Sequence, residues 1–88
     1  MLENFKDYLV SIGYSEFTPS GNPSTAYDYV KRVDKICKRE NITVSNMSKN
    51  IDHYIEKYGP TGFESEFGKK SHNAYINALR RFEEFIEQ

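Results

Sequence analysis

The sequence predicts an all-α domain, a compact bundle of four helices, with a short fifth turn near residues 42–47 as an open alternative. Apolar residues recur three and four positions apart in four separate segments, which is the period of one helix face. The chain has 88 residues, of which 38% are hydrophobic and 15% aromatic. This is enough apolar material for one core without disulfides or metal, so we expect residues 1–88 to form a single domain.

The first predicted helix spans residues 2–12, whose apolar side chains share one face. Gly13 follows directly, and glycine at that position commonly ends a helix in the left-handed conformation. Residues 14–23 are rich in Ser, Pro and Gly and predict a loop.

The second predicted helix spans residues 24–39, with Ser24 or Thr25 as its N-cap. Cys37 lies on its apolar stripe, which indicates a small buried hydrophobic side chain and not a nucleophile. The opposite stripe is interrupted only by Asp28 and is otherwise basic: Lys31, Arg32, Lys35, Lys38 and Arg39. Such a stripe suits a phosphate backbone, and it equally suits a solvated face on an ordinary helix.

The third predicted helix spans residues 49–58, with Ser48 as its cap and a Gly-Pro pair as its stop. His53 has no partner at metal-ligand spacing, which indicates a surface or boundary histidine. The following segment, residues 59–68, predicts a loop. Its two phenylalanines, Phe63 and Phe67, either anchor this loop to the core or meet a partner.

The last predicted helix spans residues 69–88, with Ser71 as its N-cap. The first half of its polar face carries cations and amides that can contact phosphates and base edges. These side chains are Lys69, Lys70, His72, Asn73, Asn77, Arg80 and Arg81. The end of the helix carries Glu83, Glu84 and Glu87. A solvated helix face is the other interpretation, and whether the two basic stripes share one side depends on the helix crossing angles.

Composition and motifs exclude several classes of protein. The net charge is −1, so DNA binding would depend on local clustering of the twelve Lys and Arg residues. A single cysteine excludes an internal disulfide, and the sequence predicts neither a signal peptide nor a membrane span, which favours the cytoplasm. Phosphate loop, zinc cluster and catalytic triad patterns are absent. We therefore expect no enzyme activity, no metal, no cofactor, no small-molecule substrate and no membrane partner.

Three stretches resemble the N-terminal core-binding domain of tyrosine recombinases, the phage-integrase family with a SAM-like helical fold. The first is FKDYLVSIGYSE followed by PSTAYDYVKRV, and the second is ITVSNMSKNIDHYIEKYG. The third, KKSHNAYINALRRFEEF, is similar to a closing Ser-x-x-Asn…Ala-Leu-Arg-x-Phe helix. The residues that match it are Ser71, Asn73 or Asn77, Ala78, Leu79, Arg80 and Phe82.

The resemblance implies a non-catalytic arm of a site-specific recombinase that binds double-stranded DNA, with the catalytic residues in a domain absent from this chain. The DNA-binding residues that it implies are Lys31, Arg32, Lys35, Lys38, Lys69, Lys70, Ser71, Asn73, Asn77, Arg80 and Arg81. The alternative is a small stand-alone phage or mobile-element protein that docks on another protein as an inhibitor or adaptor. A structural or oligomerising role is a third alternative.

Overall fold

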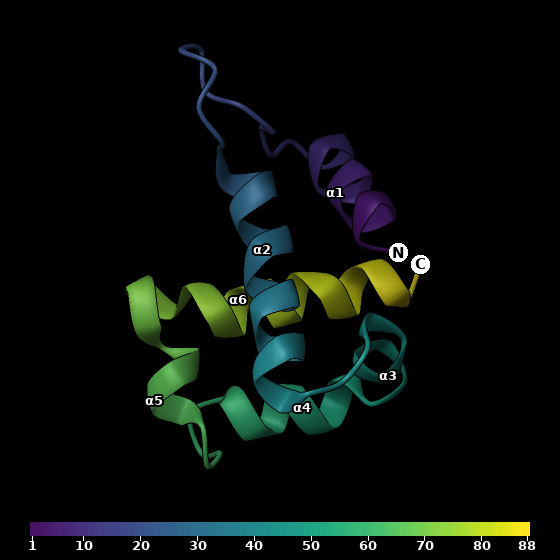
Figure 1. The fold of residues 1–88 in the computed structure, drawn as a ribbon, viewed down its shortest axis with the longest axis vertical. Helices are drawn as coiled ribbons and strands as arrows, with labels where there is room; N and C mark the ends of the chain where they lie inside the picture. Colours follow the sequence, from purple (N-terminus) through teal and green to yellow (C-terminus); the bar gives the residue numbers. More distant parts are fainter.

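A computed structural model describes residues 1–88 and is all-α, with six helices, no strands and 69% of its residues in helices. Figure 1 shows the arrangement. The helices are α1 (Leu2–Ser11), α2 (Thr25–Glu40), α3 (Val44–Lys49), α4 (Ile51–Tyr58), α5 (Ser65–Gly68) and α6 (Lys70–Ile86). None of them is both long and apolar enough to cross a membrane.

Helix α6 lies at the centre of the fold. Helix α2 crosses it, α1 packs near its C-terminal half, and α3, α4 and α5 lie on its other side (Figure 1). The apolar stripes predicted from the sequence meet here: Phe5, Val33, Leu79 and Phe82 are fully buried, and the rings of Phe5 and Phe82 contact edge-on with their centroids 5.1 Å apart. Cys37 is buried in the same core, as predicted.

Helix α1 ends as the sequence predicts, and α2 ends in a similar conformation. Gly13 takes a φ of 110°, and the N–H of Tyr14 donates to the carbonyl of Leu9 at 3.0 Å, which closes the end of α1. Asn41 takes a φ of 56° after α2 and satisfies that end in the same way. Ser24 occupies the N-cap position of α2, although its side chain makes no capping hydrogen bond.

The loop between α1 and α2 forms a short hairpin that projects away from the helices (Figure 1). An isolated bridge joins Phe17 to Pro23, and the N–H of Thr18 donates to the carbonyl of Asn22 at 2.8 Å. The side chains of Thr18, Ser20 and Asn22 hydrogen-bond to one another at the tip. The loop is therefore ordered by its own polar contacts.

The prediction that Ser48 caps the third helix is wrong, because Ser48 lies inside α3. The Thr43 hydroxyl caps α3 by accepting the N–H of Asn46 at 3.0 Å. Asn50 then separates α3 from α4. The short fifth turn left open near residues 42–47 is thus a helix, and Gly59 ends α4 as predicted.

The segment predicted as a loop, residues 59–68, contains the one-turn helix α5. Gly68 packs so closely on α4 that a Cβ there would lie 1.9 Å from the carbonyl oxygen of Tyr58. The two phenylalanines differ. The ring of Phe67 packs at a tilt against that of Tyr75, with centroids 4.6 Å apart, whereas Phe63 is fully exposed.

The prediction that Ser71 is the N-cap of the last helix is wrong. Ser71, His72 and Asn73 all take left-handed backbone conformations, with φ of 56°, 60° and 67°. The N–H of Asn73 donates to the carbonyl of Lys69 at 2.9 Å, so these residues form one left-handed turn. Such a turn costs a residue with a Cβ about 1–2 kcal/mol. Regular right-handed helix begins after this left-handed turn.

Candidate nucleic-acid interface

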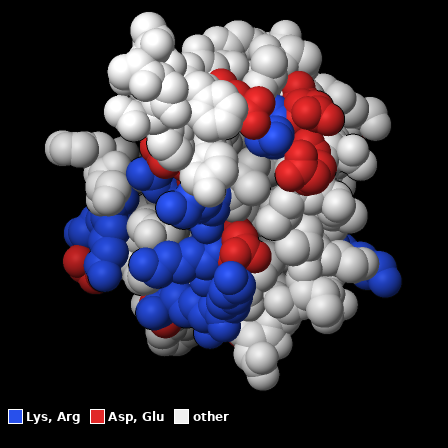
Figure 2. All heavy atoms as spheres, turned by 45° about the horizontal axis from the view of Figure 1, so that its top comes forward, with Lys and Arg blue, Asp and Glu red and all other residues white.

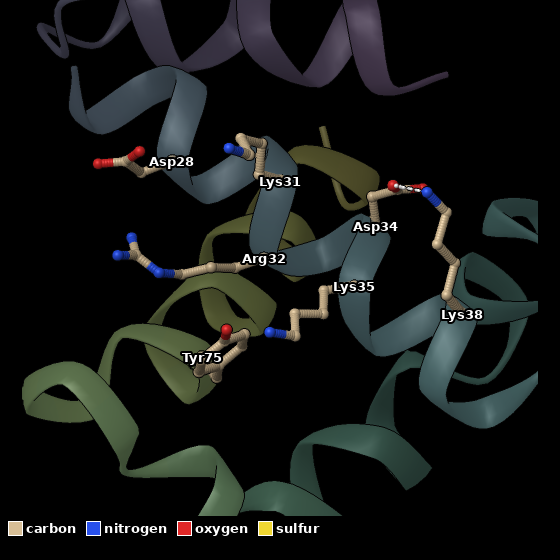
Figure 3. A pocket seen from close by; sticks show the side chains of 7 residues that line it. All are labelled: Asp28, Lys31, Arg32, Asp34, Lys35, Lys38 and Tyr75. Carbon is tan, nitrogen blue, oxygen red and sulfur yellow. Dashed lines mark ion pairs between the residues drawn. The ribbon is translucent and has the colours of Figure 1, made fainter. Parts of the chain in front are cut away.

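The basic stripe of α2 faces a groove of about 450 Å³. One turn of α6 contributes Tyr75 to its wall, and the other lining residues come from α2: Asp28, Lys31, Arg32, Asp34, Lys35 and Lys38. Figure 3 shows Lys35 extending toward Tyr75, while Lys38 lies on the other flank against Asp34. The Lys38 ammonium is 3.0 Å from the Asp34 carboxylate. Lys31, Arg32 and Lys35 therefore supply the unneutralised charge of this groove, which we call the basic groove.

Ion pairing separates the cations of this chain into two groups. Six of the twelve Lys and Arg side chains lie within 4 Å of a carboxylate. The other six have no such partner, and five of them belong to the predicted DNA-binding set: Lys31, Arg32, Lys35, Lys70 and Arg80. Figure 2 shows cations gathered over α2 on one face of the molecule. The sixth is Lys49, in α3.

Two aromatic rings connect the basic groove to the start of α6. The Arg32 guanidinium lies 6.0 Å from the centroid of the Tyr75 ring, and Tyr75 contacts Phe67. Phe67 in turn lies between Arg39, at 4.2 Å, and Lys70, at 5.0 Å. Cation–π contacts of this kind hold Arg32 and Lys70 in place without neutralising them, whereas Arg39 is also ion-paired with Glu64. Cations interleaved with aromatic rings also suit the stacking and phosphate contacts of nucleic-acid binding.

Part of the polar face of α6 lies beside α2. Asn77, Arg80 and Arg81 line a hollow of about 290 Å³ together with Tyr29 of α2 and Glu84. Arg80 is exposed and unpaired, and Asn77 lies one turn before it. Tyr29 precedes Arg32 by one turn of α2, so this hollow adjoins the basic groove. The structure thus brings the α2 stripe and these α6 residues to neighbouring parts of one surface.

Arg81 serves the fold. Its Nε donates to the Tyr14 hydroxyl at 3.1 Å, and its Nη1 pairs with the Glu84 carboxylate at 2.7 Å. Glu84 also accepts the Tyr8 hydroxyl at 3.2 Å. These contacts hold α1 and the hairpin loop against α6. The Arg81 charge is therefore neutralised by Glu84 and is less available to a ligand.

The remaining predicted residues lie apart from the basic groove. Lys69 and Asn73 line a separate hollow of about 220 Å³ with Tyr58, Gly59 and Pro60. The Lys69 ammonium is 2.9 Å from the Glu66 carboxylate. Ser71 is exposed on the left-handed turn. The hollow that Lys69 and Asn73 line therefore shares no residue with the basic groove.

An acidic cluster occupies another part of the surface. A hydrogen bond with Asp52 raises the pKa of Glu83, and the nearby carboxylate of Glu87 acts in the same direction. Asp52 lies in the first turn of α4, at the end of the fold where both chain termini lie (Figure 1). No group of three or more His, Cys, Asp or Glu side chains in the structure is arranged to hold a metal ion.

Sequence reasoning did not include Tyr75 and Phe67 among the site residues. It assigned Tyr75 to the apolar stripe of the last helix and Phe67 to a loop, because both fit those patterns. Both are half-buried in the structure. Their position in the sequence on either side of Lys69 and Lys70 is a signal, because aromatic residues interleaved with cations are typical of nucleic-acid surfaces. Comparisons with protein-family models, curated proteins and solved structures find no match to this chain.

Proposed function

We propose that this domain binds duplex DNA through the basic groove, as the non-catalytic arm of a site-specific tyrosine recombinase. The observation that carries the proposal is that Lys31, Arg32 and Lys35 are unpaired and lie together. They lie on one helix face without carboxylate partners, beside an aromatic wall, in a chain where half of the cations are ion-paired. Unpaired cations release counterions from DNA phosphates, whereas paired ones must first give up their partners.

The dimensions of the surface agree with this role. Lys31 and Lys38 are seven positions apart in the sequence, which is about 10 Å along a helix axis. A duplex presents about one phosphate charge per 1.7 Å of its length, so several phosphates lie within reach of the stripe. Asn77 and Arg80, at the adjoining hollow, have the side chains that read adenine and guanine edges. Phosphate contacts would thus position the domain, and these two residues would contact base edges.

The recombinase part of the proposal is supported by the resemblance of three sequence stretches to core-binding domains and by the all-α fold. Within this scheme the chain supplies DNA affinity, and cleavage belongs to a separate domain. We accordingly propose no catalytic role for any residue of this chain.

The test is fluorescence anisotropy of a labelled duplex at several salt concentrations. With three to five phosphate contacts, we expect the logarithm of the affinity to fall with the logarithm of salt with a slope of about −3 to −4.5. A triple variant, Lys31→Ala, Arg32→Ala and Lys35→Ala, should weaken binding and reduce that slope by about 2 to 3. Lys49→Ala is the matched control, because Lys49 is also unpaired but lies in α3. An equal loss with Lys49→Ala, or no binding by the folded protein at low salt, would contradict the proposal.

The second candidate function is a protein-interaction module, such as a stand-alone phage inhibitor or adaptor. Two observations favour it: Asp28 and Asp34 lie within the basic groove, and the net charge is −1. Both features lower the attraction for a polyanion of uniform charge. A protein that folds but does not respond to DNA in the titration above would favour this candidate.

A further inference from the structure

The hairpin between α1 and α2, residues 14–23, is tied down at its base and at its tip although it projects away from the core (Figure 1). At the base, the N–H of Ser24 donates to the carbonyl of Glu16 at 2.9 Å. The Glu16 carboxylate is itself 2.9 Å from the Lys6 ammonium of α1. Backbone and side-chain hydrogen bonds among residues 18–22 close the tip. A loop of defined shape loses little further conformational entropy when it meets a partner.

The hairpin joins the molecule at the border of the basic groove. Ser24, where its second arm enters α2, lies on the same side of the helix as Lys31 and Lys35, which follow it by seven and eleven positions. Tyr27 lies between them, and the Lys31 ammonium is 5.4 Å from the centroid of the Tyr27 ring. The hairpin therefore continues the line of the basic stripe beyond the start of α2.

The base of the hairpin also borders the hollow that Asn77 and Arg80 line. The rings of Tyr14 and Tyr29 contact edge-on with their centroids 5.4 Å apart, and Tyr29 belongs to the wall of that hollow. The hairpin thus rises beside both parts of the proposed DNA surface, the basic groove and the hollow at Asn77 and Arg80. A duplex seated on this surface would pass next to the hairpin.

The chemistry of the hairpin suits the inside of a DNA groove. Residues 17–23 carry no charged side chain, so they bring no carboxylate toward the phosphates. The Asn22 side chain donates to the Ser20 hydroxyl at 3.3 Å, and no other hydrogen bond engages its amide oxygen. An asparagine amide with a free donor and acceptor can contact an adenine edge, and an apolar ring can contact a thymine methyl group. Phe17 supplies such a ring and is 54% exposed.

We propose that the hairpin enters the major groove of the duplex that the basic groove holds, where Asn22 contacts base edges and Phe17 contacts a thymine methyl group. This inference rests on the proposed function, because the basic groove supplies the phosphate contacts that position the hairpin. A two-stranded ribbon fits the major groove, which is about 12 Å wide, whereas the minor groove is only about 6 Å wide. The hairpin would therefore add to the sequence preference of the domain.

The reach of the hairpin agrees with this placement. Ser24 and Lys31 are about 10 Å apart along the axis of α2. An extended arm from Ser24 to Ser20 adds at most about 13 Å. The tip therefore lies within about 23 Å of Lys31, and one turn of B-DNA is about 34 Å long. Phosphates at the basic groove and bases at the tip would thus belong to the same helical turn of one duplex.

Affinity and its salt dependence separate the hairpin from the basic groove. The probe is a labelled duplex that the wild-type protein selects from a random pool, and fluorescence anisotropy measures its binding. Asn22→Ala should weaken binding by about 5-fold or more and leave the salt slope unchanged, because it removes a base contact and no charge. Phe17→Ala should also weaken binding without a change in slope. Asn46→Ala, at an exposed asparagine of α3, is the matched control and should bind like the wild type.

A modified duplex tests whether the major groove is the one that is read. Adenines that carry C–H in place of N7 lose a hydrogen-bond acceptor in the major groove and nothing in the minor groove. This change should weaken binding of the wild-type protein more than binding of Asn22→Ala. Equal losses for the two proteins would overturn the contact between Asn22 and a base edge in the major groove.

A cross-link tests the position of the tip without removing any of its hydrogen bonds. Pro19→Cys places a thiol at the exposed tip, and Cys37 is buried and should stay unlabelled. With a benzophenone attached to the thiol, Pro19→Cys should cross-link to the duplex and Asn46→Cys should not. No cross-link at position 19 in a protein that binds the duplex, or unchanged affinity of folded Asn22→Ala, would overturn the hairpin contact and leave the proposed function standing. A folded wild-type protein that does not bind DNA at low salt would overturn both.

Discussion

The left-handed turn at residues 71–73 can be tested by the difference in stability between a glycine and an alanine variant. A left-handed and a right-handed backbone predict opposite signs for this difference. The perturbation is a pair of substitutions at the centre of the turn, His72→Gly and His72→Ala. The His72 side chain is exposed, so both substitutions remove the same few side-chain contacts. They differ only in the Cβ, which is what a positive φ of 60° penalises.

The magnitude follows from two terms. A left-handed conformation costs a residue with a Cβ about 1–2 kcal/mol, and glycine avoids this cost. Glycine loses more conformational entropy than alanine when the chain folds, about 0.5–1 kcal/mol. The glycine variant should therefore have a free energy of unfolding about 0.5–1 kcal/mol greater than the alanine variant. This corresponds to a melting temperature higher by about 2–8 °C for a domain of this size.

Urea unfolding followed by far-ultraviolet circular dichroism measures this difference directly. The control is the same pair at Asn77, within the right-handed part of α6, where alanine should be the more stable by about 1 kcal/mol. If alanine is also the more stable residue at position 72, the turn is right-handed. That result would refute the left-handed conformation of residues 71–73, and Ser71 would then be the helix cap that the sequence predicts.

Three further predictions concern the packing and the buried polar groups. Gly68→Ala should destabilise the fold by about 1–3 kcal/mol, measured by urea unfolding, because its Cβ would meet the Tyr58 carbonyl oxygen. Burial acts to raise the pKa of Glu40, but hydrogen bonds from Lys57 and Tyr58 outweigh it and lower that pKa below its ordinary value of 4.5. The stability that this carboxylate adds is therefore present above about pH 4.5 and is lost as the pH falls through the lower folded pKa. Glu40→Gln should lower the free energy of unfolding by about 1.5–3 kcal/mol at neutral pH, and the variant should lose less stability than the wild type on acidification. Equal acid sensitivity of the two proteins would contradict this. Burial raises the pKa of the Cys37 thiol to about 11, so a thiol reagent at about pH 8 should label the protein only after unfolding, and rapid labelling of the native state would show that Cys37 is accessible.

The fold class could be predicted because it depends on local periodicity. The apolar stripes of residues 2–12 and 24–39 locate α1 and α2 to within about two residues, the usual disagreement at helix ends. Helix α5 could not be predicted, because its four residues form a helix only where Gly68 fits against Tyr58. The left-handed turn at residues 71–73 could not be predicted either. Ser71 has the chemistry of an N-cap, and three successive residues with a Cβ at positive φ are uncommon.

The candidate site could be predicted only in part. The basic stripe of α2 can be predicted from helical spacing. Which cations of the chain remain without an ion-pair partner depends on carboxylates that are distant in sequence. Arg39 is neutralised by Glu64, 25 residues away, with the two groups 2.6 Å apart. Lys57 pairs with Glu40, 17 residues away, at 2.8 Å. Such pairs form only after the helices have packed, so the sequence could not show which cations stay available.

The acidic cluster near Glu83 has a consequence for how the molecule approaches a charged partner. With a net charge of −1, the domain is weakly repelled by a polyanion while the two are far apart. Closer in, the separation between this cluster and the basic groove gives the domain an electric dipole, and the field of the polyanion exerts a torque on it. The domain would rotate to present Lys31, Arg32 and Lys35 before contact, and added salt would weaken this orienting effect because it screens charges that are farther apart than about 10 Å.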